Sequence, residues 1–317
     1  MSGGERDAEL AICARVARHG LIGAESAALF GGVPDIDGVA RVARTGRIER
    51  AAFAQTSLRV IAEAGALDEL VASVAACSFE ADRFRIDVHD PSDRLGVDST
   101  DVAIRLADVI EFGPDLRDPQ HRFVVIAAAD GLRFCEVTGR SDAGYRRHES
   151  KPWTTSSSLE PRFCRGLVNL VPDAASVLAP CCGAGSIVLE AASLGLGASG
   201  VDDKAAMAGM TRENLAHFGY DALDDVRVER ADSRTLTSDV AADAVVTDLP
   251  YGHAIERDDD SVRAILERCG ELAPQGVFVA QHDISELLAE TGHVVSAVHT
   301  VVKRRGFTRH IHVTTTR

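Results

Sequence analysis

The second half of the sequence alternates between short apolar runs and helical stretches, and this alternation limits the possible folds more than any other feature. From residue 176 onward the expected strands are SVLAPC, ASGVDD, VRVERAD, ADAVVTD, GVFVAQ, SAVHTVVK and RHIHVTTT. Helices are expected at 186–195, 204–218 and 259–272. This pattern predicts an α/β fold with a mainly parallel, doubly wound sheet covered by helices on both faces. The last two strands leave little room for a crossover helix, so they should form an antiparallel hairpin at the sheet edge.

The first part of the sequence has a different spacing of apolar residues. Residues 8–80 show mostly helical spacing. LIGAESAALFGG predicts a short helix ended by glycines, and ERAAFAQTSLRVIAEAGALDELVASVAAC predicts helical structure with a break near Gly65. Residues 1–78 are therefore expected to form a mostly helical unit.

Beyond residue 80 the sequence indicates a compact α/β module over residues 79–148. RFRIDVHD alternates like a strand, DSTDVAIRLADVIEF reads as a helix capped by Ser99 or Thr100, and HRFVVIAAADGLRFCEVTGRSD reads as two strands joined at ADG. GYRRHESKPWTTSSS is polar and basic, which predicts a linker or exposed loop. LEPRFCRGLVNLV then predicts an amphipathic helix with Pro161 in its first turn. Residues 149–317 would hold this linker and the doubly wound domain.

Composition argues against several classes of protein. A net charge of −14 argues against a protein that coats nucleic acid indiscriminately, but it leaves room for an enzyme with a local basic face. The seven cysteines are odd in number and scattered, so free thiols in a reducing compartment are expected rather than zinc, another metal site or a disulfide framework. No uncharged apolar stretch is long enough for a membrane span, and MSGGERDAEL is not a signal peptide. A cytoplasmic protein is expected.

The expected ligand site lies outside the C-terminal ends of the parallel strands, near the point where the strand order reverses. The first strand of the doubly wound domain leads into APCCGAGS, where Gly183 and Gly185 allow a tight turn and a close approach of backbone to ligand. A helix begins directly afterwards, so its N-terminal N–H groups point toward the same place.

The next three strands each end in a carboxylate. Asp202 follows the second strand, about twenty residues after the glycines, and this spacing suits a ribose diol. Asp232 and Ser233 follow the third strand, where they could hydrogen-bond the edge of a base. The fourth strand leads into TDLPYG, which carries Asp248 and Tyr251. Such features at four successive strand ends favour a ligand site over a set of ordinary turns and helix caps.

A glycine loop followed by a ribose-binding acid is shared by two classes of enzyme, those that bind nicotinamide dinucleotides and those that bind S-adenosylmethionine. The dinucleotide fingerprint has a small residue where this sequence has Val188. No Arg or Lys flanks the loop to hold a phosphate. An adenosine that carries methionine has no phosphate, so both departures favour S-adenosylmethionine.

Four stretches, taken together and in this order, resemble the THUMP-domain tRNA guanosine N2-methyltransferases, a family that modifies the guanosine at position 10 of tRNA. They are KPWTTSSSLEPRFCRGLVNLV, APCCGAGSIVLEAA, TDLPYG and RRGFTRHIHV. Residues 81–147, which end in VTGRSDAGYRRH, resemble the THUMP module of the family. The resemblance implies a class I, Rossmann-like, S-adenosylmethionine-dependent methyltransferase domain, an α/β THUMP module before it, a small ferredoxin-like unit at the N-terminus, and tRNA as the partner.

The resemblance also implies roles for individual residues. Cys182, Gly183 and Gly185 match the donor loop of the family, Asp202 matches the acid that holds the donor ribose, and Asp232 matches the residue near the adenine amine.

TDLPYG matches the family motif that binds the target amine, through Asp248, Leu249, Pro250 and Tyr251. The Asp248 carboxylate and a carbonyl of Leu249 or Pro250 would accept the two N–H bonds of guanine N2 and so aim its lone pair at the methyl donor. Pro250 would hold these carbonyls in place, Tyr251 would stack on the base, and Asp248 would receive the proton. A base within a stem would have to be flipped out to reach this site.

Departures from the family pattern leave alternatives open. Ala179 replaces the acid that begins the family donor loop, Leu249 replaces the first proline of its motif, and Thr155 and Ser156 replace a His-Pro pair. One alternative is a methyltransferase that acts on another nucleic-acid amine, such as adenine N6 or a guanine of ribosomal RNA. The other is a catalytically silent RNA-binding homologue. The number of methyl groups, the oligomeric state and any protein partner also stay open.

Two basic clusters are candidate contacts to RNA phosphates. The linker cluster comprises Arg146, Arg147, His148 and Lys151, and the C-terminal cluster includes Arg305 and Arg309. The same charges would also fit solvated edges that protect a sheet from pairing. The family motif includes Arg309, which favours the functional interpretation there. A THUMP module would recognise tRNA by shape more than by sequence.

Overall fold

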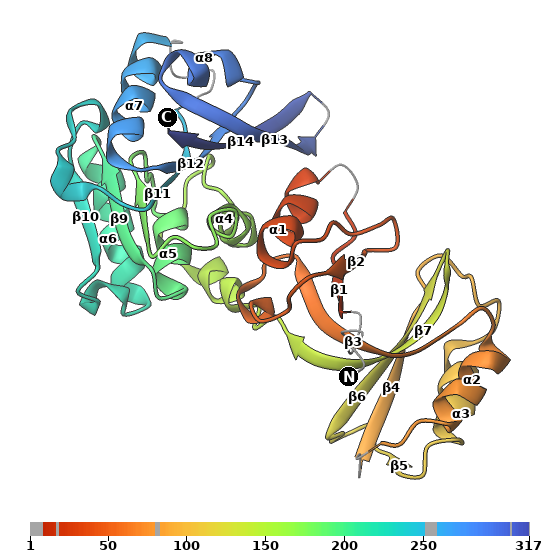
Figure 1. Ribbon diagram of the computed structural model, residues 1–317. Helices are drawn as coiled ribbons and strands as arrows, with labels where there is room; N and C mark the ends of the chain where they lie inside the picture. The colour runs from red at the N-terminus through yellow and green to blue at the C-terminus, as the bar shows by residue number, and fades with distance from the viewer. Residues whose placement is uncertain (1–8, 17–18, 80–82, 251–258, 305, 317) are drawn as a thin grey trace, which may run out of the picture. The chain divides into compact units, whose positions relative to one another are not determined.

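The computed structural model describes residues 9–16, 19–79, 83–250, 259–304 and 306–316, which form two compact units (Figure 1). Unit 1 comprises Met1–Arg15, Phe30–Glu49 and Ala54–Ser141, and unit 2 comprises Val16–Leu29, Arg50–Phe53 and Asp142–Arg317. Two short N-terminal segments therefore belong to the C-terminal unit, which the sequence patterns did not indicate. Each unit is described by itself.

Unit 2 is built on a seven-stranded sheet in the order β10-β9-β8-β11-β12-β14-β13. Its strands are β8 (Ser176–Ala179), β9 (Gly197–Asp202), β10 (Val226–Arg230), β11 (Ala244–Asp248), β12 (Gln275–Ala280), β13 (His293–Arg304) and β14 (Phe307–Thr316). Strands β8 to β12 pair in parallel, and β14 lies antiparallel between β12 and β13. The seven predicted strands and the antiparallel hairpin at the edge are confirmed.

Helices cover both faces of this sheet, as predicted. They are α4 (Pro161–Val168), α5 (Ser186–Ser193), α6 (Ala205–His217), α7 (Asp259–Leu272) and α8 (Ser285–Glu290), with 3-10 turns η2 (Gly144–Ser150), η3 (Tyr220–Ala222), η4 (Ser233–Thr235) and η5 (Ser238–Val240). Successive residues of β9 show the two faces. A Cβ on Gly200 would lie 2.9 Å from Val188 of α5, whereas Val201 packs in a core with Leu266 of α7 and Phe278 of β12.

Helix α1 (Gly20–Phe30) packs within unit 2 over all but its last residue. The helix is present as predicted, and Gly31, with φ of 81°, follows its end. A Cβ on Gly166 of α4 would lie 2.7 Å from Phe53 and 3.0 Å from Leu21. The glycine in α4 therefore allows α1 and the 50–53 segment to approach α4 closely.

Unit 1 contains a second seven-stranded sheet in the order β2-β1-β3-β7-β6-β4-β5. Its elements are β1 (Glu9–Cys13), β2 (Val39–Val42), β3 (Ala54–Ala64), α2 (Leu67–Ala75), β4 (Arg83–His89), α3 (Ser99–Ala107), β5 (Gly113–Pro114), β6 (His121–Ala128) and β7 (Gly131–Arg140), with the turn η1 (Ile48–Arg50) before β3. Phe123 and Val125 of β6 face a core shared with α2 and α3, and Val124 and Ile126 face the opposite core. The strand at 83–89 and the hairpin at ADG are confirmed.

Two local predictions for this unit need correction. The helix α3 is capped by Asp98, whose side chain accepts the N–H of Thr100 at 2.7 Å, rather than by Ser99 or Thr100. The helical interpretation of the segment before Gly65 is wrong, because Ala54–Ala64 forms β3, between β1 and β7. Pairing with two neighbouring strands overrides the helix propensity of its Ala, Leu and Glu residues. Strands from both sides of residue 78 therefore share one sheet.

Composition-based expectations can also be compared with the structure. All seven cysteines are free thiols, as predicted. Over the described ranges, no helix has the length and apolar character that would suit a membrane crossing. In the same ranges, no group of three or more His, Cys, Asp or Glu side chains is arranged to hold a metal ion.

Candidate active site

A cavity of about 860 Å³ lies in unit 2 at the C-terminal ends of β8 to β11, where the strand order reverses. It is lined by the predicted residues Cys182, Gly183, Asp202, Asp232, Ser233, Asp248, Leu249 and Pro250. Tyr251, which was also predicted, lies outside the described residues. Residues from four successive strand ends are thus brought together, as the topology of a parallel sheet requires.

The two glycines of the loop after β8 have different tasks. Both have a left-handed backbone, with φ of 56° at Gly183 and 81° at Gly185, which favours glycine. A Cβ on Gly183 would meet open space, so its backbone can contact a ligand directly. A Cβ on Gly185 would lie 2.5 Å from Thr211, so this glycine instead allows the loop to pack against α6. Thr211 also donates a hydrogen bond to the Gly183 carbonyl at 2.7 Å.

Cys182 fixes the loop through its backbone and stays a neutral thiol. Its N–H donates to the Val201 carbonyl of β9 at 2.9 Å, and its carbonyl accepts the Gly185 N–H at 2.8 Å. Burial raises the pKa of the Cys182 thiol to about 12. The side chain therefore contributes an apolar surface to the cavity rather than a nucleophile.

Asp202 joins the glycine loop to the start of α6. One carboxylate oxygen accepts the N–H of Gly183 at 2.9 Å and the other accepts the N–H of Lys204 at 3.0 Å. Burial raises the pKa of Asp202 above its usual range, and these two hydrogen bonds oppose that effect. The carboxylate is thus oriented by the backbone, with further lone pairs left for a ligand.

Asp232 and Ser233 differ in what they can offer to a base. Asp232 caps η4 and forms a bidentate pair with Arg234, whose hydrogen bonds hold the pKa of Asp232 at about 2. A carboxylate therefore faces the cavity at any ordinary pH. Ser233 is buried, and its hydroxyl donates to the Pro180 carbonyl. This hydroxyl therefore holds the loop after β8. Because Ser233 also lines the cavity and its hydroxyl oxygen can still accept, its hydrogen bond to a base edge stays a prediction.

Asp248 ends β11 and is half-buried in the cavity wall. Leu249 donates its N–H to the Val279 carbonyl of β12 at 3.0 Å, and its side chain is 4% exposed in the core beside Ile265. Both the N–H and the side chain of Leu249 are therefore used by the fold, which leaves its carbonyl for a ligand. Pro250 follows at the surface of the cavity.

The opposite part of the cavity wall comes from segments outside the parallel strands. It includes Thr155 to Ser158, Lys303, Phe307 and Arg309. Arg309 is 7% exposed, and its guanidinium lies 5.5 Å from the Phe163 ring and 5.3 Å from the Phe307 ring. Two aromatic rings thus hold this side chain in the cavity wall, and the predicted contact of Arg309 to RNA stays a prediction.

The residues predicted to form surface contacts in the linker differ in how far the fold exposes them. Arg146 and Arg147 are exposed on η2, and Lys151 is half-buried directly after it. His148, grouped with them by sequence, is 1% exposed and is therefore not a surface contact. Arg305 lies outside the described residues.

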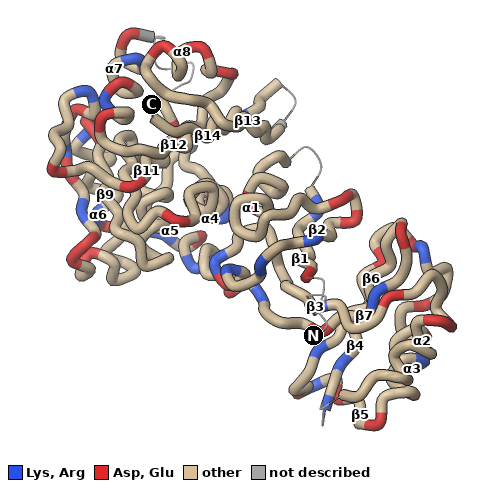
Figure 2. Tube along the Cα trace, in the orientation of Figure 1, with Lys and Arg blue, Asp and Glu red and all other residues tan. Residues whose placement is uncertain are grey.

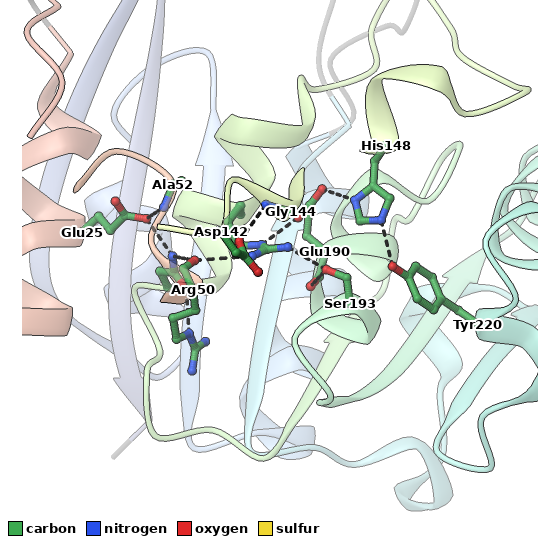
Figure 3. A network of polar contacts seen from close by, with 11 residues as sticks. Glu25, Arg50, Ala52, Asp142, Gly144, His148, Glu190, Ser193 and Tyr220 are labelled. Carbon is green, nitrogen blue, oxygen red and sulfur yellow. Dashed lines mark hydrogen bonds and ion pairs between the residues drawn. The ribbon is translucent and has the colours of Figure 1, made fainter. Parts of the chain in front are cut away.

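His148 belongs to a buried polar network that sequence reasoning missed (Figure 3). Its Nδ1 lies 2.5 Å from the carboxylate of Glu190 on α5, and its Nε2 lies 3.1 Å from the Tyr220 hydroxyl. Arg165 of α4 donates to the other Glu190 oxygen at 2.8 Å and to the Ser193 hydroxyl at 2.8 Å. The helix that begins at the glycine loop is thereby tied to η2 and α4.

A second part of the network attaches the N-terminal segments to α4. Glu25 of α1 accepts the N–H groups of Ala52 and Phe53, each at 2.7 Å, and the side-chain amide of Asn169 at 2.7 Å (Figure 3). Arg50 donates to the Asn169 amide oxygen at 2.9 Å. The sequence did carry a signal for this network, namely a glutamate inside an apolar run, as in LIGAESAALF and SIVLEAA. A charged side chain is buried only where it has partners.

Comparison with known proteins adds independent findings. Residues 149–279 match the UPF0020 family model, described as an RMKL-like methyltransferase domain. A tRNA (guanine(10)-N2)-dimethyltransferase of Methanothermobacter thermautotrophicus is 37% identical over 122 residues, which cover 38% of this chain and 35% of that protein. A protein of the same name from Pyrococcus abyssi is 27% identical over 188 residues, which cover 55% of this chain and 56% of that protein. The matches thus span from about a third to just over half of these relatives.

A solved structure extends the likeness in fold to the whole chain. The crystal structure of TrmN from Thermus thermophilus aligns with a TM-score of 0.53 at 19% identity, and the alignment covers 98% of this chain and 100% of that one. The resemblance read from the motifs and the class I, Rossmann-like fold are confirmed. Residues 149–279 of this chain are thus similar to methyltransferase domains of the RMKL-like type.

Proposed function

We propose that the protein transfers a methyl group from S-adenosylmethionine to the exocyclic N2 amine of the guanosine at position 10 of tRNA. The observation that carries the proposal is that Asp248 lines the same cavity as the glycine loop and Asp202. The curated relatives named tRNA (guanine(10)-N2)-dimethyltransferase support this choice of substrate.

The residues present fit this donor. Gly183 offers backbone beside open space, and the oriented Asp202 carboxylate suits the two ribose hydroxyls. Asp232 supplies an acceptor for the adenine amine, and the cavity volume is in the range of small-molecule sites. When bound, the donor supplies an activated methyl group on a sulfonium.

The chain's own groups would prepare the target amine. A guanine N2 amine is a weak nucleophile because its lone pair is delocalised into the ring. The Asp248 carboxylate and the Leu249 carbonyl would accept its two N–H bonds, which localises and aims the lone pair. Asp248 would then receive the proton that the amine loses. Tyr251 remains our candidate for stacking on the flipped base.

Under this proposal, parts of the chain outside the cavity would recognise the RNA. We propose that residues 79–148 act as a THUMP module, that residues 1–78 form an accessory ferredoxin-like unit, and that residues 149–317 comprise the linker and the catalytic domain in the cytoplasm. Because strands from both sides of residue 78 share one sheet, those portions of the first two parts that belong to unit 1 would act as one RNA-binding body. Arg146, Arg147 and Lys151 are the candidate contacts to phosphate.

The decisive experiment uses purified protein, labelled donor and an unmodified tRNA transcript with guanosine at position 10. A second transcript carries adenosine at that position. We expect N2-methylguanosine or N2,N2-dimethylguanosine, detected by nucleoside mass spectrometry, in the first transcript only. Methylation of an adenine or of another guanosine would overturn the substrate assignment. Absence of donor binding would favour a silent homologue.

Replacement of Asp248 tests the catalytic assignment. We expect Asp248→Ala to keep the affinity for S-adenosylhomocysteine within about twofold and to lower kcat by about 100-fold or more, because one acceptor for the amine is lost. Asp221→Ala, which removes an exposed carboxylate on η3, is the matched control. Turnover of Asp248→Ala near that of the control would contradict the role of Asp248.

A further inference from the structure

The two groups proposed to hold the target amine, the Asp248 carboxylate and the Leu249 carbonyl, do not distinguish one base from another. Both are acceptors, and the exocyclic amine of an adenine or a cytosine could donate to them as well as guanine N2. Selection of guanine therefore requires a second contact, to the edge of the ring that carries the O6 and N7 acceptors. Such a contact needs a hydrogen-bond donor in the wall of the same cavity.

Among the basic side chains of the cavity wall, Arg309 differs from the others in its burial. The described part of the wall includes Lys204, Arg234, Lys303 and Arg309. The first three are exposed, whereas Arg309 is buried, and its guanidinium lies over the rings of Phe163 on α4 and Phe307 on β14. Two elements thus fix a side chain that can only donate hydrogen bonds.

The pairing of β11, β12 and β14 places Arg309 on the same face of the sheet as Asp248 (Figure 1). Asp248 pairs with Val279, and Val279 pairs with Ile311. Paired residues carry their side chains on one face, and so do residues two apart on a strand, so Arg309 shares the face of Ile311 and Asp248. Two strand spacings separate β11 from β14 by about 10 Å, which an arginine side chain and a purine ring can span together.

Helix α4 gives a second indication that these two side chains face the same part of the cavity wall. Burial raises the pKa of the Cys164 thiol well above its usual range, and among the charges that act on this thiol Asp248 raises the pKa and Arg309 lowers it. Cys164 directly follows Phe163, whose ring contacts Arg309. Both charges therefore lie near the N-terminal half of α4.

We propose that Arg309 reads the O6 and N7 edge of the flipped guanine and is thereby the residue that makes the site specific for this base. The inference rests on the proposed function, in which Asp248 and Leu249 hold the N2 amine. Arginine bidentate to O6 and N7 is the commonest specific contact to guanine. An adenine in the same pose would turn its C2–H toward Asp248 and its N6 donor toward Arg309, which leaves both protein groups unsatisfied.

An RNA phosphate is the other acceptor group that an arginine could hold, and the burial of Arg309 favours the base. Phosphates remain on the outside of an RNA that docks on a protein surface, whereas a flipped base enters the cavity. The two aromatic rings also set the direction of the N–H groups of the guanidinium, and a fixed fork suits the two coplanar acceptors of a purine edge.

Two base analogues test this contact one acceptor at a time. 2-Aminopurine keeps the target amine but lacks O6, and 7-deazaguanine keeps the amine and O6 but lacks N7. tRNAs with guanosine or either analogue at position 10 are assembled by ligation of a synthetic fragment, and kcat/KM for methyl transfer is measured with the full chain. We expect the wild-type chain to prefer guanosine over each analogue by about tenfold or more, because each missing acceptor leaves a charged donor without its partner.

The variant Arg309→Met removes the donors and keeps much of the side-chain volume. We expect its preference for guanosine over both analogues to fall to within about threefold, since the variant and the analogues remove the same contact. Binding of S-adenosylhomocysteine by the variant shows that it is folded. Arg162→Met is the matched control, because the Arg162 guanidinium also lies over two rings, those of Phe53 and Tyr145, but Arg162 does not line the cavity. The control should keep the wild-type preference.

Each remaining outcome overturns a stated part of the proposal. If kcat/KM of Arg309→Met falls equally for all three bases, the residue holds a phosphate or stabilises the wall, and base readout is refuted. If the variant does not fold, the wild-type chain decides, because equal use of guanosine and both analogues would refute the contact. Failure of the wild-type chain to methylate guanosine at position 10 would refute the proposed function itself, whereas methylation that ignores O6 and N7 would refute only this inference.

Discussion

Asp202 combines its proposed contact to the donor ribose with partial burial, and this combination has a consequence for pH dependence. Because burial raises the pKa of Asp202, its protonation on acidification begins at a higher pH than that of an exposed aspartate. A protonated carboxyl loses acceptor capacity toward ribose hydroxyls. We therefore expect the affinity for S-adenosylhomocysteine to fall on acidification, and this fall should begin at a higher pH than the protonation of an exposed aspartate.

The variant Asp202→Asn should bind more weakly at neutral pH and change little in affinity on acidification. Asp232 provides the internal comparison, because Arg234 holds its pKa at about 2 and it stays ionised throughout. The measurement is a series of calorimetric titrations of both proteins. An affinity of the wild-type chain that changes with pH no more than that of Asp202→Asn would contradict the assignment of Asp202 to the donor.

Leu249 shows why a departure from the family motif is compatible with the fold. A proline at this position could not donate the hydrogen bond to Val279 and would remove a buried leucine side chain from the core. We expect Leu249→Pro to lower the free energy of unfolding by about 2–5 kcal/mol. Leu249→Met, which keeps the N–H and most of the volume, should cost less than about 1.5 kcal/mol. Urea unfolding of both variants checks this, and equal stabilities would show that the backbone here adapts to proline.

At the scale of elements, the strands of unit 2 were predictable because each is short, apolar and bounded by a turn or a helix with its own signals. The sequence of β3 carries no comparable signal. Its residues AQTSLRVIAEA favour a helix locally, and only pairing with β1 and β7 makes them a strand. The position of α1 in unit 2 was also beyond sequence reasoning, because it depends on contacts between segments far apart in the chain.

The candidate site was predictable to a similar degree. Parallel strands place their C-terminal ends at one edge, so Asp202, Asp232 and Asp248 could be brought together from the strand pattern alone. The side chains of Ser233 and Arg309 could not be placed in this way. Their partners, Pro180 and the two aromatic rings, are chosen by tertiary packing.

The network around Glu190 links the helix that follows the glycine loop to two other elements, and its removal should be costly. Glu190→Ala would leave Arg165 buried without its carboxylate partner, so we expect a loss of about 3–5 kcal/mol in the free energy of unfolding. The double variant Arg165→Met, Glu190→Leu should lose less than Glu190→Ala, because no charge is then left uncompensated. Glu229→Ala, at an exposed site on β10, is the control. Equal losses in the single and double variants, by chemical unfolding, would show that packing rather than charge pairing stabilises this region.

At the scale of the whole molecule, unit 2 is completed by N-terminal residues. Glu25 and the 50–53 segment share hydrogen bonds with Asn169, so the unit is not continuous in sequence. Residues 149–317 and the N-terminal segments of unit 2 are therefore expected to depend on each other for stability. A boundary drawn at residue 149 would remove buried partners from α4.

The charge of the whole molecule limits how it could bind RNA under the proposed function. With a net charge of −14, the proposed binding of tRNA would depend on a few local basic residues, since acidic and basic residues are interspersed along both units (Figure 2). Several arginines of unit 1 are already in ion pairs, as in Arg59 with Glu136 and Arg83 with Asp118. Arg146 and Arg147 are exposed, and within the described ranges neither forms an ion pair. They are the better candidates for phosphate contacts.

We expect the double variant Arg146→Ala, Arg147→Ala to bind tRNA more weakly at low salt and to reduce the slope of log affinity against log salt concentration by about 1 to 2, because each lost phosphate contact removes about 0.7–0.9 of slope. The affinity for S-adenosylhomocysteine should not change, since neither residue lines the cavity. Arg59→Ala is the control, because its charge is already neutralised by Glu136 and its loss should leave the slope nearly unchanged. If the double variant and the control give the same slope as the wild-type chain, Arg146 and Arg147 are solvated residues, and the phosphate contacts must come from other parts of the molecule.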